Sequence, residues 1–182
     1  QVEINKAIDA LNGQAGKVEL SAATFRTSSP ILVRENLTLC GQGIGTVVFL
    51  RDGSNCTMIK TKPWTARDNV TIRDLRLNGN GSKQAQGPNW GDGHAIESSG
   101  ASSLYDNLTI ENTWAGGIRH QGDNAKILNI VLRNTQWAAI SLIDSWDAKV
   151  MNNDIRDCAA TVEDQGKGNC IHAFGGGRIE VS

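Results

Sequence analysis

Apolar and polar residues alternate in short segments along most of this chain, and several segments share one four-residue pattern. The pattern is an asparagine, an aliphatic residue, threonine or valine, and a second aliphatic residue. It occurs at residues 36–39, 69–72, 107–110 and 129–132. Alternation with a period of two, in segments rich in Val, Ile, Leu and Thr, predicts β-strands.

The spacing of these segments predicts stacked repeats. The step from Asn107 to Asn129 equals the step from Ile96 to Ile118 and from Ile118 to Ile140. A fixed period of about 20–25 residues is typical of solenoids, and short strands joined by turns predict a parallel β-helix. The first two coils, counted from the asparagine pattern, would be longer than this, and the second would be the longest. Their length indicates insertions in the turns.

One segment departs from the strand pattern. Residues 3–12 carry Ile4, Ala7, Ile8 and Leu11 on one helical face, and Asn12 and Gly13 end the segment. Solenoids need caps over their open ends, so this helix is expected to cover the first coil. The chain is thus one domain, 1–182, with a helical cap at 3–12 and coils at 17–182. Residues 178–181 look like the start of another coil, so we expect an uncapped or truncated C-terminal end.

Composition excludes some classes of function. The formal net charge is −1 and no basic stripe is present, so a nucleic-acid partner is not expected. No apolar run approaches the length of a membrane span, so no membrane partner is expected either. Four cysteines could form two disulfides or remain as buried thiols, and none lies near a histidine with the spacing of a zinc site, so no metal ligand is assigned. The cysteines are Cys40, Cys56, Cys158 and Cys170.

Four stretches near the N-terminus resemble the N-terminal part of the pectate lyase-like superfamily: 4–10, 16–20, 36–43 and 46–50. The resemblance implies an all-β, single-stranded, right-handed parallel β-helix that is secreted or carried on a phage virion. It implies action on a polysaccharide, because the superfamily includes pectate lyases, polygalacturonase-type hydrolases, alginate epimerases and tailspike depolymerases. A free enzyme would be a monomer and a tailspike a trimer.

The catalytic motifs of these families do not recur here. The sequence contains Gly91-Asp-Gly-His94 and Gly117-Ile-Arg-His120, but no Asp-Asp pair, no Gly-His-Gly and no Tyr-Gly-Phe-Asp-Pro-His run. The candidate site therefore has to come from the register of the strands.

Strand register predicts a column of functional side chains. If Ile96, Ile118 and Ile140 point into the coil, the residues that follow them point outward, because strand side chains alternate. We expect an exposed column of Glu97, Arg119 and Ser141, with His172 as the next member through the segment 170–173. The alternative is an ordinary cross-strand ion pair between Glu97 and Arg119.

Two chemistries could use the column. In a lyase, Arg119 would be the base, and Asp92 and Glu97 could bind Ca²⁺ if the reaction requires it. In an inverting hydrolase, Glu97 and Asp144 would be the carboxylate pair, about two strands apart, and His172 would tune one of them. A carbohydrate-binding or structural β-helix without catalysis is the competing hypothesis.

Residues near the column are candidates for binding the substrate. Tryptophans at the neighbouring turns could stack on sugar rings or could simply cover the turns. The substrate-binding candidates are Asp92, Trp90, Trp114, Trp137, Ser141 and Gln121, and Trp146 also lies near a turn.

Other polar residues are expected to be structural. His94 and His120 share the parity of the inward-facing isoleucines, so both should face the interior or a turn. A turn ladder of stacked polar side chains is predicted at Asp74, Asn112, Asn134 and Asp157.

Overall fold

The computed structural model describes residues 2–61, 67–85, 92–158 and 170–182. Within them one helix, α1 (Val2–Ala10), precedes a succession of short parallel strands. The first strand of each coil belongs to β1 (Gly16–Glu19), β4 (Leu37–Cys40), β7 (Thr71–Asn78), β9 (Leu104–Thr113), β11 (Lys126–Leu128), β14 (Lys149–Met151) and β17 (Glu180–Val181).

Two further columns of strands complete each coil. The second column contains β2 (Thr24–Thr27), β5 (Val47–Leu50), the later halves of β7 and β9, β12 (Val131–Thr135) and β15 (Asp154–Cys158). The third column is a separate sheet of β3 (Ile31–Val33), β6 (Ile59–Thr61), β8 (Ile96–Ser99), β10 (Ile118–Gln121), β13 (Ile140–Trp146) and β16 (Ile171–Gly177). Short 3-10 turns lie at Gly43–Gly45 and Gly81–Lys83.

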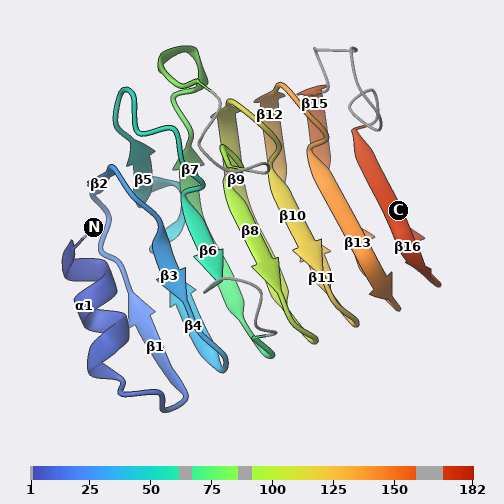
Figure 1. Ribbon diagram of the computed structural model, residues 1–182, viewed down its shortest axis with the longest axis horizontal. Helices are drawn as coiled ribbons and strands as arrows, with labels where there is room; N and C mark the ends of the chain where they lie inside the picture. The colour runs from blue at the N-terminus through green and yellow to red at the C-terminus, as the bar shows by residue number, and fades with distance from the viewer. Residues whose placement is uncertain (1, 62–66, 86–91, 159–169) are drawn as a thin grey trace.

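Every strand pairs in parallel with its counterpart in the next coil, which is the arrangement of a parallel β-helix. Ile118 of β10, for example, aligns with Ile96 on one side and Ile140 on the other, and all three are fully buried. The coils stack from α1 at one end to β16 at the other (Figure 1). The predicted fold class and the inward register of the isoleucines are confirmed.

The corners between strands explain the repeated asparagines. At one corner, each successive coil has a residue with positive φ. Asparagine and aspartate tolerate this left-handed conformation better than other residues with a Cβ. Stacked side chains there bond between coils: Asn69 Nδ2 donates to Asn36 Oδ1 at 3.0 Å. The residues of this first corner are Asn36, Asn69, Ser102, Asn124, Asp147 and Arg178.

The asparagine pattern recurs at two different corners, and this overturns part of the predicted repeat. Asn107 and Asn129 lie at a second corner, in register with Asp74. The coil that begins at Asn69 therefore ends at Ser102 and not at Asn107, so the prediction that it is longer than the coil before it is wrong. The two corners look alike in sequence because each needs a left-handed residue immediately before a buried strand.

The predicted turn ladder is correct for three of its four members. Asn112, Asn134 and Asp157 align at a third corner, where Asn134 Nδ2 donates to Asn112 Oδ1 at 2.8 Å. Asp74 belongs to the second corner instead, and its Oδ1 accepts from Asn107 Nδ2 at 2.8 Å. Its sequence position after an asparagine pattern suggested the wrong alignment.

The helix α1 closes the first coil as predicted, although it spans Val2–Ala10 and not 3–12. Ile4 and Ile8 are buried against the core, and Asn12 at the following turn has positive φ. Asn5 covers the edge of β3: its Oδ1 accepts from the Leu32 amide at 2.9 Å, and its Nδ2 donates to the Pro30 carbonyl at 3.1 Å. At the other end, β17 pairs with β14, so the predicted start of a further coil is confirmed.

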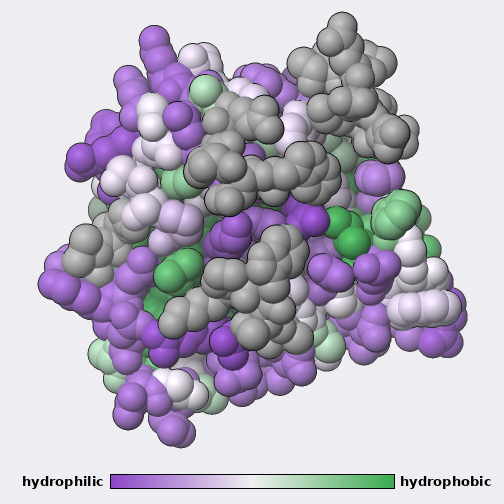
Figure 2. All heavy atoms as spheres, viewed as in Figure 1, coloured by the Kyte–Doolittle hydropathy of each residue, from purple (hydrophilic) through white to green (hydrophobic). Residues whose placement is uncertain are grey.

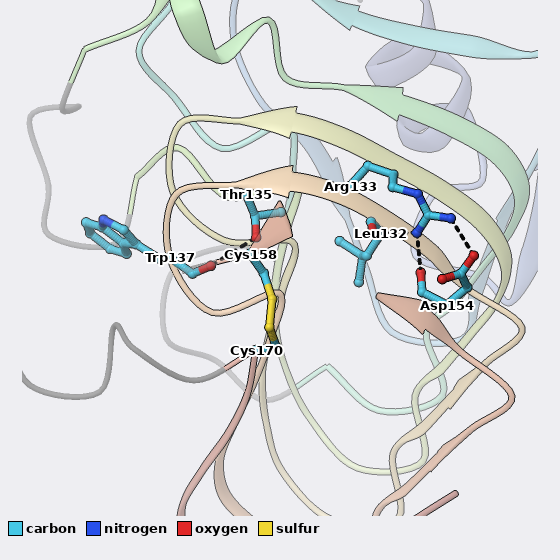
Figure 3. The surroundings of a disulfide bond; sticks show 7 residues. All are labelled: Leu132, Arg133, Thr135, Trp137, Asp154, Cys158 and Cys170. Carbon is cyan, nitrogen blue, oxygen red and sulfur yellow. Dashed lines mark hydrogen bonds and ion pairs between the residues drawn. A yellow bond between two sulfur atoms is a disulfide. The ribbon is translucent and has the colours of Figure 1, made fainter. Parts of the chain in front are cut away.

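Of the four cysteines, two form a disulfide and two are free thiols. Cys158 and Cys170 form a disulfide, which joins the end of β15 to the residue before β16 (Figure 3). Cys40 is buried and Cys56 half-buried, and both are free thiols. The bridge closes a loop whose residues 159–169 lie outside the described part of the chain.

On the face of the molecule that Figure 2 shows, the described residues are mostly hydrophilic, with scattered hydrophobic ones between them. Among the described residues, no helix is both long and apolar enough to cross a membrane.

Candidate active site on the third strand column

The predicted column of side chains exists, and it has one more member. Glu97, Arg119, Ser141 and His172 align on successive strands from β8 to β16. Lys60 of β6 precedes them, in register with Glu97. Sequence reasoning missed Lys60 because the chain between it and Glu97 is longer than the step between the next strands. The sequence pattern that could have identified Lys60 is an apolar residue, Ile59, followed by a charged one, as at Ile96 and Glu97.

An ion-pair network links the first members of the column. Glu97 lies between two cations: its Oε2 is 2.9 Å from Lys60 Nζ, and its Oε1 accepts from Arg119 Nη1 at 2.8 Å. Lys60 Nζ is also 3.7 Å from Asp92 Oδ1. Both carboxylates are buried, each only 6% exposed, so they need such partners to remain charged away from water.

The burial of Glu97 corrects the expectation of an exposed column. The cross-strand ion pair considered as an alternative is present, but it is part of a larger network and not an isolated surface pair. Because Lys60 contacts both Asp92 and Glu97, these two carboxylates do not fit a Ca²⁺ site as the structure stands. Within the described ranges, no group of three or more Asp, Glu, His or Cys is placed to hold a metal ion.

Ser141 and His172 extend the column beyond the network. Both are half-buried and occupy the next two strands after Arg119. With strands about 4.8 Å apart, Arg119 and His172 are separated by about 10 Å at the backbone, with Ser141 between them. The column therefore presents a guanidinium, a hydroxyl and an imidazole in a row.

Two adjoining hollows open next to the column. A small one, of about 20 Å³, is lined by Lys60, Thr61, Glu97, Ser98, Ser99, Arg119 and Gln121. An open one, of about 420 Å³, shares Ser99 and Gln121 with it and continues to Asp68, Gly100, Ala101, Gly122, Asp123 and Asp144. Gln121 Nε2 donates to Asp144 Oδ2 at 3.3 Å, so these two candidates belong to the larger hollow.

The structure does not support Glu97 and Asp144 as a hydrolytic pair. Asp144 lies three positions beyond Ser141 along β13, toward the far end of the strand, as well as two strands away from Glu97. Strand dimensions place the two backbones about 14 Å apart, so both side chains would have to point toward each other to bring their carboxyl groups within the roughly 6.5–9.5 Å of inverting glycosidases. The Glu97 carboxylate is instead paired with Lys60 and Arg119. The sequence argument counted strands but not this displacement along them.

His120 lies in the coil interior behind the column, as predicted. It is fully buried, and its Nδ1 is 2.9 Å from Tyr105 Oη and 3.1 Å from Ser98 Oγ, which also contact each other. Burial lowers the pKa of His120 to about 4 and raises the pKa of Tyr105 to about 12. Both groups are therefore neutral near pH 7. His94 is likewise buried, with its ring against the edge of Trp137.

The tryptophan candidates separate in space. Trp114 and Trp137 are half-buried neighbours at the corner before β10 and β13, with ring centroids 5.7 Å apart. Trp146 is 51% exposed at the other end of β13. Trp90 lies outside the described residues.

Comparison with known proteins places the fold. The chain matches no family model and no curated protein. Among solved structures, the A-modules of the Azotobacter vinelandii mannuronan C-5 epimerases AlgE4 and AlgE6 are similar to it. For AlgE4 the TM-score is 0.66 at 21% identity, over 85% of this chain and 47% of the module. For AlgE6 the TM-score is 0.67 at 18% identity, over 97% of this chain and 52% of the module.

A protein from Parabacteroides merdae that has been suggested to be a glycosyl hydrolase superposes with a TM-score of 0.74 at 12% identity. That match covers 100% of this chain and 91% of the other. Against the epimerase modules, the chain spans about half their length. The strand register and these similarities together show that the chain has the right-handed parallel β-helix fold.

Proposed function

We propose that this β-helix acts on an acidic polysaccharide by abstracting the proton next to a uronate carboxylate, followed by β-elimination of the glycosidic bond. The observation that carries the proposal is the column itself, in which Arg119, Ser141 and His172 occupy successive strands of one face. The similarity of the fold to mannuronan C-5 epimerase modules supports a polysaccharide as the ligand.

Arg119 is suited to bind the uronate carboxylate. Arg119 pairs with Glu97, and a guanidinium is in general a poor base but a good partner for a second carboxylate. The lyase hypothesis from the sequence, with Arg119 as the base, is therefore less favourable. Neutralising the carboxylate makes the adjacent carbon more acidic, because charge that develops there in the transition state is stabilised.

His172 is suited to be the base. An imidazole can act as a general base, and His172 lies two strands from Arg119, about 10 Å at the backbone, with Ser141 between them. His172 would take the proton on the carbon next to the carboxylate. The electron pair of that C–H bond then forms the double bond, the glycosidic C–O bond breaks, and the leaving oxygen takes up a proton.

The test is incubation with polymannuronate, polyguluronate, polygalacturonate and a neutral glucan. Absorbance of unsaturated products in the near ultraviolet and new reducing ends are followed in parallel. We expect both signals with at least one polyuronate. His172→Ala should lower kcat by about a hundredfold or more, and Arg119→Ala should raise KM as well as lower kcat.

Lys126→Ala is the matched control, because Lys126 is an exposed cation on β11, in another strand column. It should behave like the unaltered protein. Reducing ends without absorbance would show a hydrolase, and incorporation of solvent deuterium without cleavage would show epimerisation. Binding with neither signal would favour the non-catalytic hypothesis, and an undiminished kcat in His172→Ala would rule out His172 as the base.

A further inference from the structure

We propose that Trp114 and Trp137 form a second sugar-binding site, separate from the column, which holds the polysaccharide along the direction of the strands. This inference rests on the proposed function only for the class of ligand. The two indoles lie at the corner before the strands that carry Arg119 and Ser141. Their ring centroids are 5.7 Å apart at an interplanar angle of 58°.

The position of Trp137 in the fold does not call for a large residue. Backbone hydrogen bonds place Trp137 above Ala115, and Ala115 above Gly93, in successive coils. The same corner is thus built with an alanine one coil earlier and a glycine two coils earlier. The buried residues that follow Trp137 are Ala138 and Ala139, so the interior of this corner is filled by small side chains. In Figure 3 the indole of Trp137 points outward from the turn.

The site is held rigidly. Thr135 Oγ1 donates to the Trp137 carbonyl at 2.9 Å, and the Trp137 amide donates to the Ala115 carbonyl at 3.1 Å. The ring of His94 meets that of Trp137 edge-on at 5.7 Å between centroids. A Cβ on Gly93 would lie only 3.1 Å from Trp114 Cε3, so that indole packs directly on the glycine backbone. Fixed aromatic rings lose little entropy on binding, which favours their use as anchors.

The placement of the two tryptophans predicts the direction of the bound polymer. Ser141 follows Trp137 by four positions, so their backbones are at most about 14 Å apart. The line between them runs along β13, and the larger hollow at Gln121 and Asp144 continues it. The polysaccharide would therefore lie parallel to the strands, and a few sugar rings would span the distance from the two tryptophans to the column.

The test uses His172→Ala, in which turnover is suppressed, with uronate oligosaccharides graded from disaccharide to octasaccharide. Intrinsic tryptophan fluorescence and calorimetry report binding. Adding Trp114→Ala or Trp137→Ala should weaken binding of the long oligosaccharides by on the order of tenfold, since aromatic anchors dominate such contacts. Disaccharides, which cannot span column and tryptophans together, should bind equally in all variants.

Phe49→Ala is the matched control, because Phe49 is a half-buried aromatic residue on β5, in the second strand column, where its ring contacts Arg26. It should leave affinity at every length unchanged. Trp114→Phe and Trp137→Phe, which keep an aromatic ring, should recover most of the lost affinity and guard against misfolding. Equal affinities in the alanine variants and the control would overturn the proposal.

The two proposals fail separately. Tryptophan-dependent binding by a protein that produces no unsaturated sugar would leave the second site standing and refute elimination. Unsaturated products, with an affinity for polysaccharide that does not change when either tryptophan is replaced, would support elimination and refute the second site. A protein that binds no polysaccharide at any length overturns both.

Discussion

Glu97 illustrates what decides the role of a single residue in this molecule. In the sequence it is an acid in an outward position of a strand, which normally means a solvated side chain. In the structure it is buried between Lys60 and Arg119, and removing either cation would leave a carboxylate with incomplete compensation. Such losses typically cost about 3–5 kcal/mol, so the network is a structural requirement as well as part of the candidate site.

His120 makes stability depend on pH. Its folded-state pKa of about 4 lies below the value near 6.5 of an unfolded chain, because the folded protein buries the ring. The unfolded chain therefore binds the proton first as pH falls. We expect the free energy of unfolding to decrease between about pH 6.5 and pH 4, by about 3 kcal/mol from this residue. Urea unfolding at a series of pH values measures the effect.

His120→Leu provides the comparison. The variant lacks the titrating group, so the difference in unfolding free energy between it and the unaltered protein should shrink as the solution is acidified. A difference that stays constant from pH 7 to pH 4 would show that other groups cause the acid sensitivity.

At the scale of elements, the helix and the strands were largely predictable because their signals are local. The helical period of Ile4, Ile8 and Leu11 identifies the helix, and alternation identifies the strands. The alignment of one coil on the next was less predictable. All three corners use left-handed asparagine or aspartate, so equal sequence patterns at Asn69 and Asn107 mark different corners.

The cap predicts a specific loss of stability. Ile8 is 1% exposed on α1, packed against the first coil. Ile8→Ala should lower the free energy of unfolding by about 2–4 kcal/mol, because it removes buried methylene groups and leaves a cavity. Lys6→Ala, on the solvent side of the same helix, should change it by less than about 0.5 kcal/mol. Similar losses in both variants would mean that helix formation, not capping, is affected.

At the scale of the whole molecule, each coil contacts only its neighbours, so stability should vary along the stack. Strands β7 and β9 are paired on both sides, whereas β17 pairs only with β14 among the described strands. Hydrogen exchange read by mass spectrometry should find the slowest amides in β7 and β9 and the fastest strand amides in β17. Uniform protection from β1 to β17 would instead indicate one cooperative unit.

The sequence by itself determined the fold class, the helical cap and the column from Glu97 to His172. A period of two, a constant step from Glu97 to Ser141 and the similar segment at 170–173 specify which side chains share a face. Tertiary structure alone decided that Lys60 joins the column, that Glu97 is buried and that Asp144 belongs to a different hollow. It also selected Cys158 and Cys170 as the disulfide. These features depend on how insertions of different length bring distant strands into register, and local patterns carry no information about that distance.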